Sequence, residues 1–266
     1  MKNNRLTVAG LRDLKGTRQL TMLFVDTADE AAAASAAGID ILSIIAPVWT
    51  AEMRAAAGDC FVQVGLLYGP LCTYEDYIRA SHAALMTGGD AVYCAASIDI
   101  ITRLAAEGIP VIGHAGLVPS KATWTGGFKA VGKTAASALQ VFAQVKQLEA
   151  AGAIGAELEV VPGRVAAEIS KRTALIMLSM GAGRGGDAQY LFAEDVLGYT
   201  RGHRPRHAKV YRNFRAEYDR LQLERIAAFK EFRADVEAGI YPGPEHLVAV
   251  EDKEFAAFMR GLPARR

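Results

Sequence analysis

Three side chains that can take part in proton transfer or nucleophilic attack each close a short apolar segment of the sequence. Cys94 ends one segment, His114 ends the next and Glu159 ends the one after that. If these segments are consecutive parallel strands, their carboxyl ends meet at one edge of a sheet, and the three side chains can share a pocket. A glutamate in a closed, dry pocket has a raised pKa and can act as a general base or acid.

Each of the three residues also has a structural interpretation. Glu159 can be a carboxylate satisfied by neighbouring donors at the rim, or it can be a general base or acid. His114 can be a structural hydrogen-bonding residue, or it can hold an oxyanion or shuttle a proton. Cys94 can be a small apolar residue that fills space, or a thiolate nucleophile beside His114 with Glu159 orienting the imidazole.

The segments that carry these residues alternate with amphipathic stretches that have helical spacing. Several of those stretches end in glycine, which suits the left-handed position that closes a helix. The apolar runs are nearly uniformly apolar, as strands covered on both faces are. They occupy residues 20–25, 39–45, 61–67, 91–94, 110–113, 155–160 and 174–180, with a weaker eighth run near 196–199.

This alternation predicts an α/β fold, a (β/α)8 TIM barrel with a C-terminal helical extension. An open doubly wound sheet is the alternative, but the Gly-rich dinucleotide turn expected after the first strand is missing. With 266 residues, 51% of them hydrophobic, the chain is expected to form a single domain over residues 1–266. Residues 118–134 are expected to be an active-site lid, and residues 213–239 a helix that packs on the barrel or on another subunit.

Charge and composition narrow the classes of partner. The formal net charge is +1, with acidic and basic residues mixed along the chain, which argues against nucleic acid or an anionic membrane. The 3 cysteines form no CxxC motif, and no apolar leader or membrane-spanning run is visible. We therefore expect a cytoplasmic protein that binds a small molecule.

Several motifs in one order make the chain similar to the ketopantoate hydroxymethyltransferase family of the phosphoenolpyruvate mutase/isocitrate lyase superfamily. The strand Ile109-Pro110-Val111-Ile112-Gly113-His114-Ala115-Gly116 resembles that family's fifth strand, and Gly126-Gly127-Phe128-Lys129 resembles its lid. Leu158-Glu159-Val160-Val161-Pro162 resembles the strand that carries its catalytic base. Asp187-Ala188-Gln189 and Tyr241-Pro242-Gly243-Pro244 continue the match, which runs from about residue 20 to residue 247.

The resemblance implies a reaction next to the carbonyl of a 2-oxo acid. The family transfers a one-carbon unit from methylenetetrahydrofolate, a magnesium ion stabilises the enolate, and a glutamate removes the proton. It implies that Glu159 is the base and that the protein is a homo-oligomer.

The chain departs from the family at the magnesium ligands. The family's metal-binding side chains fall at Ala46, Gly65 and Ala96, and its substrate-binding lysine falls at Cys94. Alanine and glycine side chains offer no oxygen to a magnesium ion. We therefore predict a metal-independent enzyme, with methylenetetrahydrofolate as an open possibility.

Further residues near the predicted strand ends are candidates for substrate binding. Asp26 follows the first strand and Pro47 the second, and Asp187 follows the seventh. Trp124 and Lys129 belong to the predicted lid, where tryptophan offers an apolar wall and lysine a positive charge for a carboxylate.

Three functions remain open from the sequence. The first is a transferase, aldolase or retro-aldol lyase acting next to a carbonyl, with Glu159 as base and hydrogen-bond donors holding the oxyanion. The second is a repurposed hydrolase or lyase that uses Cys94, His114 and Glu159. The third is a barrel that binds a small carboxylic acid without catalysis.

Overall fold

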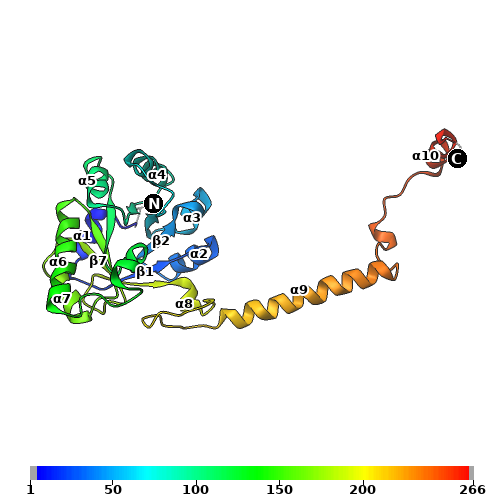
Figure 1. The fold of residues 1–266 in the computed structure, drawn as a ribbon. Helices are drawn as coiled ribbons and strands as arrows, with labels where there is room; N and C mark the ends of the chain where they lie inside the picture. The colour runs from blue at the N-terminus through cyan, green and yellow to red at the C-terminus, as the bar shows by residue number, and fades with distance from the viewer. Residues whose placement is uncertain (1–4, 264–266) are drawn as a thin grey trace. The chain divides into compact units, whose positions relative to one another are not determined.

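The chain divides into two units, residues 1–212 and 213–266, and the computed structural model describes residues 5–263. The first unit contains a closed barrel of eight parallel strands in sequence order (Figure 1). The strands are β1 (Leu20–Phe24), β2 (Ile41–Ile45), β3 (Phe61–Gly65), β4 (Ala91–Tyr93), β5 (Val111–Gly116), β6 (Gly155–Glu159), β7 (Ile176–Met180) and β8 (Ala188–Phe192). The (β/α)8 fold predicted from the sequence is confirmed.

Helices join the strands and begin at residues whose side chains can cap them. Thr27, Thr50, Thr73, Ser97 and Thr134 each accept a hydrogen bond from a backbone N–H of the first turn that follows. The helices of this unit are α1 (Val8–Leu14), α2 (Ala28–Ala36), α3 (Ala51–Ala56), α4 (Tyr74–Met86), α5 (Ile98–Ala106), α6 (Ala135–Ala150), α7 (Gly163–Ser170) and α8 (Ala193–Leu197), with 3-10 helices η1 (Ala46–Val48) and η2 (Pro119–Thr125).

The eighth strand lies earlier in the sequence than we expected. Residues 196–199 fall at the end of α8 and just beyond it, whereas β8 is Ala188–Phe192. No helix separates β7 from β8, so the short segment 181–187 carries the chain back to the start of the next strand. β8 is short and contains Gln189, and it pairs with β1 on one side and β7 on the other. The pairing with β1 joins opposite ends of the barrel sequence, and local apolar periodicity does not register it.

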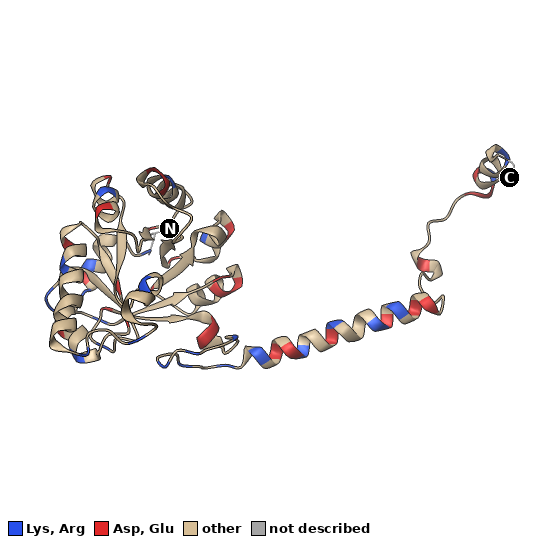
Figure 2. Ribbon diagram, in the orientation of Figure 1, with Lys and Arg blue, Asp and Glu red and all other residues tan. Residues whose placement is uncertain are grey.

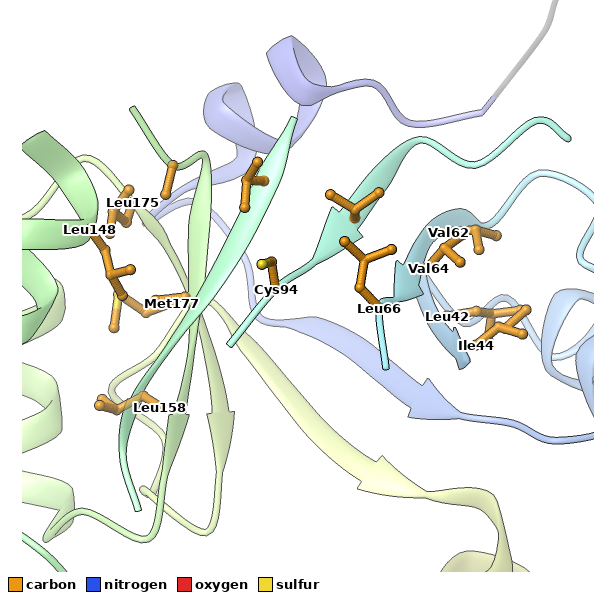
Figure 3. Packing of buried hydrophobic residues seen from close by; sticks show 14 of the residues in the cluster. Leu42, Ile44, Val62, Val64, Leu66, Cys94, Leu148, Leu158, Leu175 and Met177 are labelled. Atoms are coloured by element: carbon orange, nitrogen blue, oxygen red, sulfur yellow. The ribbon is translucent and has the colours of Figure 1, made fainter. Parts of the chain in front are cut away.

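Alternation along each strand divides the core into an inner and an outer layer. Side chains two residues apart share one face of a strand, so one set fills the barrel and the other faces the helices. The inner set includes Met22, Phe61 and Tyr190. The outer set includes Leu42, Val64, Cys94 and Leu158 and packs against the helices, among whose residues is Leu148 of α6 (Figure 3).

Within residues 213–263, the second unit has no buried core. It comprises α9 (Phe214–Glu237), the 3-10 helix η3 (Pro244–His246) and α10 (Asp252–Gly261). None of the residues in these helices is buried. Acidic and basic residues are interspersed along α9 (Figure 2), among exposed apolar residues such as Phe229 and Phe232. Among residues 5–263, no helix has the length and apolar character needed to cross a membrane.

Candidate active site at the barrel mouth

A cavity of about 410 Å³ lies at the carboxyl ends of the strands and gathers most of the inward-facing polar side chains. Tyr93 of β4, His114 of β5 and both Glu157 and Glu159 of β6 line it. A larger groove, of about 1080 Å³, lies along α6 and α7 and is lined mainly by aliphatic side chains, with Lys133, Glu168 and two arginines. We place the site in the barrel mouth because the catalytic chemistry of this fold is found there.

His114 is held from both sides of its ring. Nε2 lies 2.8 Å from the carbonyl oxygen of Leu117 and 3.3 Å from Oε2 of Glu159, and Nδ1 lies 2.7 Å from the hydroxyl of Tyr93. A carbonyl oxygen can only accept, so Nε2 carries a hydrogen. The proton that His114 gains or loses therefore resides on Nδ1, on the side of Tyr93.

Glu159 is placed by a tight turn at the end of β6. Val160, the next residue, has φ of +49°, a conformation that a β-branched residue rarely adopts. Its N–H donates to Met180 and its carbonyl accepts from Val131 of the predicted lid. On the other side, a Cβ at Gly116 would lie 2.5 Å from the carbonyl oxygen of Glu159. Glycine at 116 thus permits the close approach that brings Glu159 beside His114.

Below this pair lies a second carboxyl group that is almost fully buried. Glu157 accepts a hydrogen bond of 2.6 Å from Nε2 of Gln63, which also donates to the hydroxyl of Ser43 at 3.0 Å. Oε2 of Glu157 lies 3.7 Å from Nδ1 of His114. Oε1 of Gln63 is buried and has no hydrogen-bond partner among the described residues. Buried polar groups are normally paired. The side-chain oxygen of Gln63 is therefore still able to accept a hydrogen bond.

Burial and neighbouring charges shift the protonation of this cluster. Burial raises the pKa of Glu157 to about 7, and the charge of Glu159 adds to the rise. Burial acts to lower the pKa of His114, but the hydrogen bond to Glu159 and the charges of both glutamates outweigh it and raise the pKa overall. Burial also raises the pKa of Tyr93 strongly, so this phenol keeps its proton. The cluster can hold and move protons near neutral pH.

Cys94 does not line this cavity. Because Tyr93 faces the barrel interior, the next residue faces the helices, and Cys94 lies in the outer core with Leu66 and Leu148 nearby in the same cluster (Figure 3). Burial raises the pKa of its thiol to about 11. The structure brings Glu159 and His114 together as predicted, but it directs the Cys94 thiol elsewhere.

The two predicted rim aspartates lie outside the cavity. Asp187 precedes β8 and therefore lies at the amino-terminal end of the barrel, where it pairs with Lys15 at 2.7 Å and accepts from the N–H of Met177. The turn after β7 returns the chain to that end, which the sequence did not reveal. Asp26 is exposed after β1, with its N–H bonded to Glu30.

The remaining predicted substrate-binding residues are exposed and do not line the cavity. Pro47 lies in η1, and Trp124 is 89% exposed at the end of η2. Lys129 is exposed, and its Nζ would lie 3.2 Å from a Cβ built on Gly126 of the same loop. The loop contributes Pro119 and Phe128 to the cavity instead.

The donors in the cavity do not fit a magnesium site formed by the ends of β2, β3 and β4. From β2, β3 and β4 and the positions just after them, the cavity is lined by Ser43, Ile45, Gly65, Leu66 and Tyr93, while Ala46 and Ala96 lie outside it. Among the described residues, no group of three or more His, Cys, Asp or Glu side chains is arranged to hold a metal ion. Magnesium is bound by oxygen ligands, and these strand ends supply no carboxylate.

Several residues of the cavity and of the polar layer below it were missed by the sequence analysis, although strand alternation could have found some of them. Glu157 is two residues before Glu159 and Gln63 two residues before Gly65, so each shares the inward face of its strand. Tyr93 was passed over because Cys94 was taken as the inward residue of β4. His207 and Asp195 also line the cavity, but they follow β8, and no local pattern pointed to them.

Comparisons with known proteins agree with the motif order. The family model described as ketopantoate hydroxymethyltransferase matches residues 48–244. A 3-methyl-2-oxobutanoate hydroxymethyltransferase of Halalkalibacterium halodurans is 32% identical over 211 residues, covering 76% of this chain and 72% of that protein. The enzyme of the same name from Thermus thermophilus is 32% identical over 266 residues, covering 91% of this chain and 99% of that protein.

Solved structures support the fold. A structure described as a putative phosphonomutase from Burkholderia cenocepacia J2315 has a TM-score of 0.55 and 14% sequence identity, covering 85% of this chain and 100% of that chain. At this level of identity the likeness concerns the fold alone.

Proposed function

This chain belongs to the ketopantoate hydroxymethyltransferase family, and we propose that it makes or breaks a carbon–carbon bond next to a carbonyl group, with Glu159 as the general base. The observation that carries this proposal is the shared placement of Glu159 and His114 in one cavity, with Oε2 and Nε2 3.3 Å apart. The related enzymes named above are hydroxymethyltransferases, which act at such a carbon.

Glu159 would remove a proton from the carbon beside the carbonyl, and the oxygen of that carbonyl would gain negative charge. Tyr93 is the donor that can meet this charge. When His114 is protonated, its Nδ1–H donates to the hydroxyl oxygen of Tyr93, which leaves the Tyr93 O–H free to donate into the cavity. The raised pKa of His114 favours this state. Activity should therefore fall as the pH rises through the pKa of His114, which lies above 6.5.

No step of this proposal passes through a metal ion, because the donor set does not fit the family's magnesium site. Metal independence and the use of methylenetetrahydrofolate as the one-carbon donor remain proposals. A Cys94 nucleophile has no geometric support, since the thiol lies in the outer core.

The test is hydrogen–deuterium exchange at the carbon beside the carbonyl, followed by NMR over a panel of carbonyl compounds. Glu159→Gln should slow exchange about a thousandfold, within the range that a general base contributes. Glu52→Gln, an exposed carboxylate change on α3, is the matched control and should leave exchange unchanged. Exchange that survives in Glu159→Gln would remove this residue from the base's role.

We also propose a cytoplasmic homo-oligomer that uses the second unit for assembly. The described part of that unit buries no helical residue while it displays apolar side chains, a composition typical of an interface. Sedimentation of the full chain should give a mass above one subunit, and Phe229→Asp on α9 should lower it. Lys230→Asp on the same helix is the control and should preserve the assembly.

A further inference from the structure

The cavity at the barrel mouth is acidic. Its charged lining consists of Glu157, Glu159 and Asp195, together with His114 and His207. Among the described residues, no lysine or arginine lines it. The balance of formal charge in the cavity therefore depends on whether its histidines and its buried glutamate are protonated.

The histidines do not reverse the negative charge. Burial lowers the pKa of His207, so this ring is neutral near pH 7. His114 is already committed to protein partners at both nitrogens, as its contacts with Leu117, Glu159 and Tyr93 show. Even with His114 protonated and Glu157 neutral, the carboxylates of Glu159 and Asp195 leave an excess of one negative charge.

The lysines of the loop over the mouth are directed to other places. Lys121 lines a separate small cavity with Cys94 and Gln144, and Lys133 lines the groove between α6 and α7. Lys129 lies beside Gly126. The loop supplies Pro119 and Phe128 to the cavity, both of them apolar.

The rest of the wall is apolar and aromatic. Phe24 and Phe192 are in contact, with ring centroids 4.8 Å apart, and Phe192 also meets Tyr190 at 5.8 Å. Ile45 and Met180 complete this side. A volume of about 410 Å³ lies in the range of small-molecule sites.

A ligand with a free carboxylate would bind weakly in this cavity. It would lose its hydration, meet carboxylates of like charge and find no guanidinium or ammonium group as a partner. An uncharged carbonyl compound loses little on entry and gains contact with the aromatic wall. From this charge distribution and wall, we propose that the site takes an uncharged ketone, aldehyde or amide with an apolar body, and discriminates against free 2-oxo acids.

This inference rests on the proposed function for the reaction but concerns which carbonyl compound enters. It sets the chain apart from relatives whose name specifies 2-oxobutanoate, an anion. The test uses matched pairs that differ only in charge, 3-methyl-2-oxobutanoate against 3-methyl-2-oxobutanamide and phenylpyruvate against its amide. Binding is measured by calorimetry and exchange by NMR, each with and without magnesium ions.

We expect each amide to bind at least about tenfold more tightly than its acid, with or without magnesium. Equal or tighter binding of the acid under either condition overturns the inference, and so does failure of both members of both pairs to bind. If the amides bind more tightly but no compound exchanges its hydrogen, the proposed reaction fails while the charge preference stands. The two proposals are thus separable.

Two variants place the preference in this cavity. Ile45→Lys adds a cation to the wall and should shift the acid-to-amide binding ratio toward the acid by about tenfold, whereas Ile45→Met should not. Where Ile45→Lys fails to fold, the double variant Glu159→Gln/Asp195→Asn removes two charges with little change of shape and should shift the ratio in the same direction. An unchanged ratio in the folded charge variants overturns the inference.

Discussion

The two halves of the barrel mouth are built from the same type of strand but carry different chemistry. Strands β4 to β6 present Tyr93, His114 and Glu159, which are linked by polar contacts of 2.7 and 3.3 Å. Strands β1, β2 and β8 present Phe24, Ile45 and Phe192, which offer apolar surface. The first set holds titratable groups in contact with one another, while the second is mainly apolar, with Ser43 and Asp195 as polar residues on its side. The contrast teaches that the hydrogen-bonded polar groups and the aromatic wall of this mouth come from different strands of one barrel.

The strongest test of the polar half is the pH dependence of stability. The pKa of Glu157 rises from 4.5 to about 7 on folding, so between these pH values the folded chain keeps a proton that the unfolded chain has released. Stability therefore falls as the pH rises through this window, by roughly 3 kcal/mol above pH 7. Glu157→Gln should recover most of this stability at pH 8 and little at pH 4, measured by urea unfolding.

His114 changes stability in the same direction, because its pKa is also raised on folding. The stability that it contributes is present below its unfolded pKa of 6.5 and is lost as the pH rises through the higher folded value. Glu157→Gln should thus flatten the pH profile without abolishing its slope. If Glu157→Gln is less stable than the parent at pH 8, the ionised Glu157 carboxylate is better stabilised in the folded protein than its burial and hydrogen bonds indicate.

A second test places a charge on β3, next to the apolar half. A Cβ at Gly65 would meet Ile45 at 3.6 Å, an ordinary contact, so the backbone leaves room for a Cβ there. Gly65→Asp should lower the free energy of unfolding by about 2 kcal/mol at pH 8 because the carboxylate has no partner there. Gly65→Asn, with nearly the same shape, should cost less. If magnesium ions restore the stability of the aspartate variant, this half is closer to a metal site than its present side chains show.

A third test removes the hydrogen bond between the Tyr93 hydroxyl and the ring of His114. Tyr93→Phe removes the hydroxyl bonded to Nδ1 of His114 and should lower stability by about 1 kcal/mol. Deuterium exchange should fall about tenfold or more if this hydroxyl meets the oxyanion. The pH profile of the residual exchange should also lose the decrease at high pH that the deprotonation of His114 causes. If Tyr93 has only a structural role, Tyr93→Phe would alter stability and leave the decrease of exchange at high pH unchanged.

The smallest effect is expected at Cys94. Its thiol is buried in the outer core with a pKa raised to about 11, so it should react slowly with iodoacetamide in the folded chain. Cys94→Ala should change the exchange rate by less than about twofold and stability by about 1 kcal/mol. If Cys94→Ala abolishes exchange while the fold stays intact, the thiol takes part in catalysis.

The sequence predicted the barrel because its signals are local. Apolar runs, Thr and Ser caps and helix-closing glycines such as Gly38 and Gly108, with φ of 76° and 77°, each report on a few neighbouring residues. The eighth strand was predicted at the wrong residues because β8 is defined by its pairing with β1 and β7, which closes the barrel. Closure is a long-range property that local patterns do not encode.

The site was predicted in part for a related reason. His114 and Glu159 stand in motifs and were found, whereas Tyr93 required knowledge of which face of β4 points inward. A shift of one residue reverses every side chain of a strand, so Cys94 was given the place of its neighbour. Asp187 was likewise assigned to the wrong end of the barrel, because the segment after β7 returns without a helix.

Val160 gives the mouth a mechanical property. A β-branched residue held at positive φ carries strain of about 1–3 kcal/mol, which its surroundings have to sustain. One of its two backbone restraints comes from Val131 in the loop above. If the loop moves at Val131, the turn loses that hydrogen bond, and the backbone next to Glu159 is no longer held from that side. The position of the Glu159 carboxyl group in the cavity therefore depends on a backbone contact with the loop as well as on β6.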